Sequence, residues 1–134
     1  MTSLLNKLIH KLIHIQHISP LHIITIIMMI KLAPYQYIHV LDKNKNITRL
    51  EEGPYNFFPK DHEEVVTGNK PLDMIILPLD SFALISNPVK RNDKGQLEME
   101  DHGEVKVRFG EQEYRTDRLY PEPFPLYPGE SCAK

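Results

Sequence analysis

The sequence predicts an all-β fold of two small antiparallel β modules in tandem, preceded by a short helical or disordered segment. Short runs of β-branched and aromatic residues carry this prediction, together with the turn-forming clusters that separate them. The chain also has 11 prolines against 6 glycines, a balance typical of strand edges and corners. Its 134 residues suit one ordinary domain or two very small ones.

Residues 1–29 differ in kind from the rest, because they are mostly Leu, Ile, His, Lys and Met and contain no acidic residue. Leucine and isoleucine recur at three-to-four spacing up to Ile13, which predicts a short amphipathic helix. Pro20 should end that helix. We therefore treat residues 1–29 as an atypical segment outside the modules.

The stretch from residue 12 to residue 30 carries no formal charge and approaches the length of a membrane span. His14, Pro20 and His22 interrupt it, and such groups are costly in lipid. A disordered or loosely helical segment is therefore the favoured interpretation. A membrane anchor over residues 12–30 and a cleaved signal peptide stay open as alternatives.

The first module is predicted over residues 30–73. Residues 35–41 have the aromatic and β-branched character of a strand, and the polar run 42–46 turns the chain. Residues 47–50 form the return strand, and Gly53 with Pro54 closes the corner. The unit is a strand, a turn and a second strand, followed by a proline corner.

The second module is predicted over residues 74–134, where it also includes an inserted hairpin and the start of a linker to a following repeat. Residues 74–77 read as a short buried strand, and residues 82–85 and 113–116 as two more. Between them apolar and charged residues alternate, so we expect Leu97 and Met99 to share one face and the side chains of Val105, Val107 and Phe109 to point inward. Residues 101–103 suit the turn of the hairpin.

An internal repeat links the two modules. Residues 54–59 match residues 123–128 in form: proline, aromatic residue, any residue, apolar residue, aromatic residue, proline. Modules of this size bury little apolar surface, so they usually depend on neighbours within the chain or beyond it.

The residues offer no constellation for catalysis, so we expect no enzyme and no cofactor. The run 42–46 mimics the start of a calcium loop, but Ile47 stands where that loop needs glycine. The histidines of residues 1–29 lack a nearby carboxylate or thiolate, so no metal site is predicted. A net charge of −2 argues against direct nucleic-acid binding. The single cysteine, Cys132, fits a reducing compartment.

Several ordered motifs carry a family resemblance. They are Ala-Pro-Tyr-Gln-Tyr-Ile-His-Val-Leu-Asp at 33–42, Gly-Pro at 53–54, Ser-Asn-Pro-Val at 86–89 and Glu-Pro-Phe-Pro-Leu-Tyr-Pro-Gly-Glu at 122–130. Together they resemble the first two repeats of the major vault protein family, the shell subunit of the vault ribonucleoprotein particle. The resemblance implies a structural subunit whose tandem β repeats stand side by side with other vault chains, and no enzyme.

The same resemblance implies further partners: a poly(ADP-ribose) polymerase, a telomerase-associated protein and a small vault RNA. It implies a cytoplasmic location, with the nucleus as a second one. The family continues through more repeats, a shoulder and a cap helix, so we expect this chain alone to form no closed shell. A membrane-tethered β module and a small protein-binding β module are the alternative functions.

We expect two sets of residues at a protein–protein interface. One set is aromatic, and the other is a ladder of alternating charges that could set the register with a neighbouring copy. The alternatives are that the aromatics form packed corners of the core and that the charges only face solvent. The interface residues predicted here are Tyr35, Tyr37, Phe57, Phe58, Glu104, Lys106 and Arg108.

Overall fold

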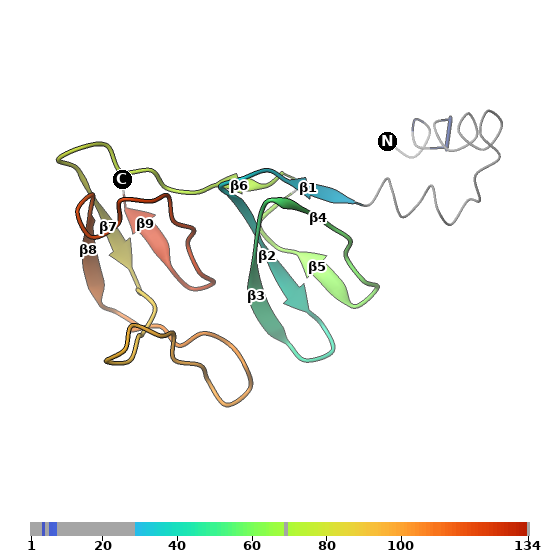
Figure 1. Cartoon of the computed structure of the whole chain (residues 1–134). Coiled ribbons are helices and arrows are strands. Elements are labelled where there is room, and N and C mark those ends of the chain that lie inside the picture. The colour runs from blue at the N-terminus through green and yellow to red at the C-terminus, as the bar shows by residue number, and fades with distance from the viewer. Residues whose placement is uncertain (1–3, 5, 8–28, 69, 134) are drawn as a thin grey trace.

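The computed structural model describes Leu4, Asn6, Lys7, residues 29–68 and residues 70–133. Residues 29–68 and 70–133 form three antiparallel sheets, which confirms the all-β prediction (Figure 1). Most of the predicted N-terminal helix and most of the predicted anchor over residues 12–30 lie outside the described residues. Within it, no helix has the length and apolar character needed to span a membrane.

The first group of strands is organised around β2 (Gln36–Asp42), which pairs with three other strands. Its turn forms as the sequence predicts, because the Asp42 side chain accepts hydrogen bonds from the N–H groups of Asn44 (3.0 Å) and Lys45 (3.2 Å). The other strands of this group are β1 (Ile30–Leu32), β3 (Ile47–Glu52), β4 (Tyr55–Phe57), β5 (Glu63–Val65) and β6 (Leu72–Asp73).

Alternate residues of β2 form the first core. Ile38 and Val40 are fully buried and pack with Leu32 and Phe57. Because side chains alternate across a strand, Tyr37 and His39 point to the opposite face of the same sheet. We call that second face the outer face of the first module.

The second group contains β7 (Phe82–Ser86), β8 (Gln112–Thr116) and β9 (Ser131–Ala133), with β7 in the centre. Ala83, Ile85 and Phe124 form its core. The strand predicted over residues 74–77 is wrong: only Ile75 makes a ladder contact, an isolated bridge to Phe124, and Ile76 is exposed. Prolines close on both sides of this run limit the pairing it can make.

Residues 87–111 connect β7 to β8 and replace the four-residue turn of the first module. They contain isolated bridges but no named strand, and three of their segments bond in a ring. The backbone N–H of Lys90 donates to the carbonyl of Lys106 (2.8 Å). The N–H of Lys106 donates to the carbonyl of Glu98 (2.9 Å), and the N–H of Glu98 donates to the carbonyl of Lys90 (2.9 Å). We call residues 87–111 the insertion.

The insertion departs from the predicted side-chain pattern at its end. Phe109 is 87% exposed, so the expectation that it points inward is wrong. It lies in the turn before Gly110, which has a φ of 82°, and so it falls beyond the last bridge between Val89 and Val107. The alternating pattern therefore ends at Val107.

The two modules repeat one another at the level of the backbone. Ile30 pairs with Phe57, as Ile75 pairs with Phe124. Tyr35 and Asp80 both have positive φ, 64° and 59°, at the entry to the central strand. The repeat predicted from the proline motifs is therefore two residues out of register, since Phe57 corresponds to Phe124 (124 − 57 = 67) whereas the motifs aligned 54 with 123 (123 − 54 = 69).

Candidate assembly surfaces

The outer face of the first module is covered by a segment of the second module. The His39 Nε2 atom lies 2.7 Å from the Leu126 carbonyl oxygen. A carbonyl oxygen only accepts hydrogen bonds, so His39 donates from Nε2 and the proton of the neutral ring is assigned there. Tyr37, beside His39 on this face, is 4% exposed. The Leu126 carbonyl therefore joins the two modules, and we call residues 125–129 the covering segment.

The pKa of Tyr37 reflects this cover. Burial raises the pKa of the phenol, a backbone hydrogen bond from Leu126 opposes the rise, and the charge of Glu130 adds to it. The net effect is a pKa of Tyr37 above its ordinary value of 10.0. Tyr127, on the covering segment, also has a raised pKa, through burial first and then through the charge of Glu52.

The insertion makes the second contact between the modules. The N–H of Thr48, on β3, donates to Glu104 Oε1 at 2.9 Å. Gly103 lies beside the same strand: a Cβ there would approach the Cδ1 of Ile47 to 3.3 Å. In Figure 1 the insertion, coloured yellow to orange, reaches below the strands towards the start of β3. Glu104 thus satisfies an edge-strand N–H that would otherwise need water.

A buried ion pair ties the covering segment to the second module. Arg115 on β8 and Glu130 are both buried, and the Arg115 guanidinium donates to Glu130 Oε2. The same oxygen accepts from the N–H of Val89 at 2.9 Å, and Oε1 accepts from the N–H of Tyr127 at 2.9 Å. The carboxylate thereby joins three separate parts of the chain with its hydrogen-bonding capacity well used.

Arg115 is also stacked between aromatic rings, with its Cζ atom 5.2 Å from the Tyr120 centroid and 5.1 Å from the Phe124 centroid. Burial lowers the pKa of the guanidinium, but the charge of Glu130 and the hydrogen bond to Glu113 outweigh it, so the net pKa is raised. Arg115 is therefore a fixed cation inside the module.

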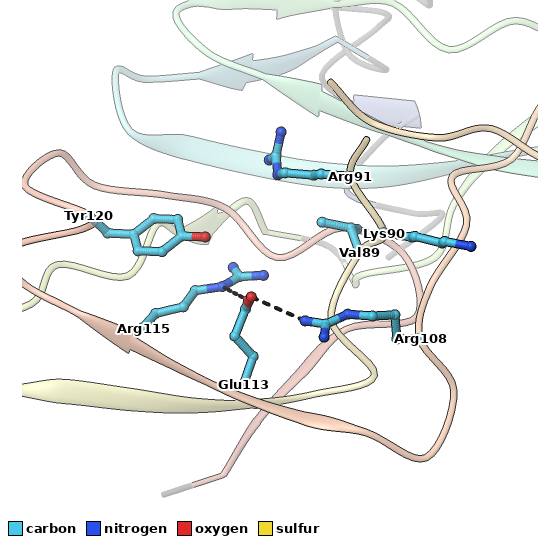
Figure 2. A pocket seen from close by; sticks show the side chains of 7 residues that line it. All are labelled: Val89, Lys90, Arg91, Arg108, Glu113, Arg115 and Tyr120. Atoms are coloured by element: carbon cyan, nitrogen blue, oxygen red, sulfur yellow. Dashed lines mark hydrogen bonds and ion pairs between the residues drawn. The ribbon is translucent and has the colours of Figure 1, made fainter. Parts of the chain in front are cut away.

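A hollow of about 320 Å³ opens beside this ion pair. Figure 2 shows Arg108 and Arg115 both reaching Glu113, with Tyr120 above Arg115. The Arg108 Nη2 and Arg115 Nε atoms lie 3.1 Å and 3.0 Å from the Glu113 carboxylate. In this arrangement the charges of Arg108 and Arg115 are both paired with Glu113. Among residues 29–68 and 70–133, no group of three His, Cys, Asp or Glu side chains could hold a metal ion.

The first module contains a related ion pair. Arg49 Nη2 lies 2.5 Å from Glu63 Oε2, and the Arg49 Cζ atom lies 5.8 Å from the Phe57 centroid. Glu63 accepts the Lys60 N–H at 3.0 Å, as Glu130 accepts that of Tyr127. Phe57 and Glu63 thus stand in the same relation as Phe124 and Glu130.

The structure separates the aromatic residues that the sequence placed at an interface. Tyr37 and Phe57 are buried, Tyr37 beside Leu126 and Phe57 in the first core. Tyr35 and Phe58 are exposed. Burial within the chain favours packed corners for the first pair, and the interface role of all four residues stays a prediction.

The structure brings the three charged candidates into the insertion. Glu104 is engaged with Thr48, and Arg108 is paired with Glu113. The backbone of Lys106 belongs to the ring of bonded segments. The contact of these three residues with a neighbouring copy stays a prediction.

Sequence reasoning missed the most exposed aromatic pair on a strand face. Phe82 and Tyr114 have ring centroids 5.3 Å apart with an interplanar angle of 68°. They lie on β7 and β8, on the face of the sheet opposite Ala83 and Ile85. The alternation of β7 was a usable signal, because Phe82 and Leu84 cannot share a face with the buried Ala83 and Ile85.

Comparisons with known proteins bear on the two modules. Residues 74–134 match a family model described as Major Vault Protein repeat domain. Over 105 residues the chain is 48% identical to major vault protein alpha of Dictyostelium discoideum. The aligned region covers 78% of this chain and 12% of that protein.

Two animal relatives give the same result. The chain is 46% identical over 100 residues to the major vault protein of Strongylocentrotus purpuratus (75% of this chain, 11% of that protein). It is 39% identical over 106 residues to the major vault protein of Mus musculus (79% and 12%). The chain thus spans about an eighth of the length of the curated relatives it matches. The chain is therefore similar to major vault proteins over about three quarters of its length, with the repeat model matching residues 74–134, and the resemblance seen in its motifs is confirmed.

Proposed function

We propose that the chain is a structural, non-enzymatic element that associates with other major vault protein chains through its β modules. The observation that carries the proposal is the joint between the modules, in which one repeat covers the outer face of the repeat before it. Repeats built this way gain stability from neighbours, so an array of them is a natural structural wall. The repeat-family relationship supports the same role.

Side-by-side association is the finer part of the proposal. Many weak lateral contacts between identical repeats add up when the chains form a closed ring. The exposed Tyr35 and Phe58, together with the charges of Glu104, Lys106 and Arg108, are the proposed contact residues. A poly(ADP-ribose) polymerase, a telomerase-associated protein and a small vault RNA stay proposed partners of the particle, without residues assigned to them.

The exposed thiol of Cys132 supports a reducing location, which we propose to be the cytoplasm, with the nucleus second.

Co-assembly with a full-length relative tests this function. The tagged chain would be co-expressed with the major vault protein alpha of Dictyostelium discoideum and the lysate separated on a density gradient. We expect the tagged chain to sediment with the large particles of the full-length protein. A tagged chain that stays at the top of the gradient, while the full-length protein sediments normally, would contradict the proposal.

A further inference from the structure

The outer face of the second module carries an aromatic pair that the described residues leave open. Phe82 and Tyr114 are each 63% exposed, and Leu84 lies beside them on the same face. We call Phe82, Leu84 and Tyr114 the open face. Paired aromatics on a sheet surface are typical of interaction sites, because they offer a large apolar area at small entropic cost.

The first module shows how the corresponding face is covered. In the ladders Tyr37 pairs with Glu52, as Phe82 pairs with Thr116, and each pair lies two residues from the start of its repeat's positive-φ turn. Phe82 is therefore the counterpart of Tyr37. Tyr37 is only 4% exposed, and Leu126 of the covering segment lies beside it and His39. The same position in the second module is open only because no corresponding segment lies over it in the described chain.

The counterpart of the covering segment lies in the first module. Phe57 corresponds to Phe124 and Glu63 to Glu130, so residues 58–62 correspond to residues 125–129. Phe58, Lys60 and Asp61 are exposed there, whereas Leu126 and Tyr127 are partly buried. One end of the molecule thus presents a covering segment, and the other end presents a face to be covered.

The existing joint and the proposed one differ in a hydrogen bond. In the existing joint His39 Nε2 donates to the Leu126 carbonyl oxygen at 2.7 Å. The counterparts are Leu84 and Pro59, and the leucine side chain has no donor. Docking of residues 58–62 on the open face therefore replaces that hydrogen bond by apolar contact with Phe82, Leu84 and Tyr114.

We propose that the open face docks residues 58–62 of a second copy of this chain, in head-to-tail association. The inference rests on the proposed structural function and adds a second contact to the lateral one, with Phe58 shared by both surfaces. The contact is heterologous, because a different surface is used on each partner, so every associated copy keeps one free segment and one free face. Short open chains follow from that geometry.

Sedimentation velocity of the full chain over a range of concentrations tests the proposal. Three variants are compared with the natural sequence: Phe82→Ser with Tyr114→Ser on the open face, Phe58→Ser on the segment, and Phe109→Ser as a matched control. Circular dichroism and thermal unfolding establish that each is folded, and all three alter exposed side chains. We expect the first two to weaken association by about tenfold each and the control to leave it unchanged.

Three results would overturn the proposal. One is a natural chain whose sedimentation coefficient does not change with concentration. Another is weakening by the open-face variant but not by Phe58→Ser, which would indicate pairing of two open faces. The third is equal weakening by Phe109→Ser. These sedimentation measurements use this chain alone, whereas the gradient experiment uses a full-length relative. A negative result here would therefore contradict head-to-tail docking without contradicting the proposed function.

Discussion

At the scale of single residues, one carboxylate holds the second module together. Glu130 binds Arg115, the Val89 N–H and the Tyr127 N–H at once. Removing its charge leaves Arg115 buried with only Glu113 beside it, and breaking a buried ion pair is costly. The same carboxylate also holds the covering segment, through the N–H of Tyr127.

We predict that Glu130→Gln lowers the free energy of unfolding by about 3 kcal/mol, because a buried cation loses its partner and a backbone donor loses its acceptor. Urea unfolding measures the change. Glu111→Gln is the matched control, since Glu111 is exposed and lies 3.8 Å from Arg108, and it should change stability by about 0.5 kcal/mol or less. Equal effects of the two substitutions would refute the structural role of the buried pair.

The first module should respond to acid through Glu63. Burial raises the pKa of this carboxyl, but the Lys60 N–H and the Arg49 guanidinium outweigh it, so the net pKa lies below 4.5. A lowered pKa in the folded state stabilises the fold at pH values above 4.5, and that contribution is lost as the pH falls through the lowered value.

We therefore predict that Glu63→Gln flattens the loss of stability between neutral pH and about pH 3, as thermal unfolding across that range would record. The natural chain should lose more of its stability in acid than the variant does. Superimposable acid profiles for the two proteins would rule out the assigned role of Glu63.

At the scale of the elements, the sequence predicted the strands that alternate and end in recognisable turns. β2, β3, β7 and β8 appear where apolar alternation and polar turns placed them. Residues 74–77 and the inserted hairpin did not become strands, because periodicity reports which face a residue prefers and not whether a partner strand is available. The ring of Lys90, Glu98 and Lys106 depends on three distant segments meeting, which the local sequence does not encode.

The corner after β3 is the element most sensitive to one added atom. A Cβ at Gly53 would lie 2.1 Å from the Ala33 carbonyl oxygen, far inside contact distance, and that oxygen is backbone. We predict that Gly53→Ala costs about 3 kcal/mol of stability through the forced shift of the chain. Chemical denaturation measures it.

Gly95→Ala provides the comparison for that corner. Its site is open but has a φ of 78°, so only the backbone penalty of about 1 kcal/mol is expected there. A Gly53→Ala protein as stable as the Gly95→Ala protein would show that the corner is not tightly packed.

At the scale of the whole molecule, the two modules are alike in backbone but unlike in burial. Tyr37 is covered and its counterpart Phe82 is open, although both are aromatic residues at the same place on a central strand. The sequence identified the aromatics as candidates for core or interface but could not divide them, since burial depends on which neighbour lies above each face. The four aromatic candidates accordingly split into two buried and two exposed residues.

This asymmetry gives the molecule two different ends. The proposed role as part of a repeat wall needs ends that fit each other, and the open face with residues 58–62 supplies one such fit. The motifs that are similar to major vault proteins are continuous in sequence, so the chain alone was sufficient to predict that similarity. The correspondence between the open face and residues 58–62 could be recognised only from the register of the strands.

Mixing two variants tests the head-to-tail claim most directly. The open-face variant, Phe82→Ser with Tyr114→Ser, keeps its segment intact, and the Phe58→Ser variant keeps its open face intact. In sedimentation velocity we predict that each variant alone remains mostly monomeric and that an equimolar mixture forms heterodimers but nothing larger, because each pair contains only one intact contact. A mixture that sediments as the average of its two components would contradict the account.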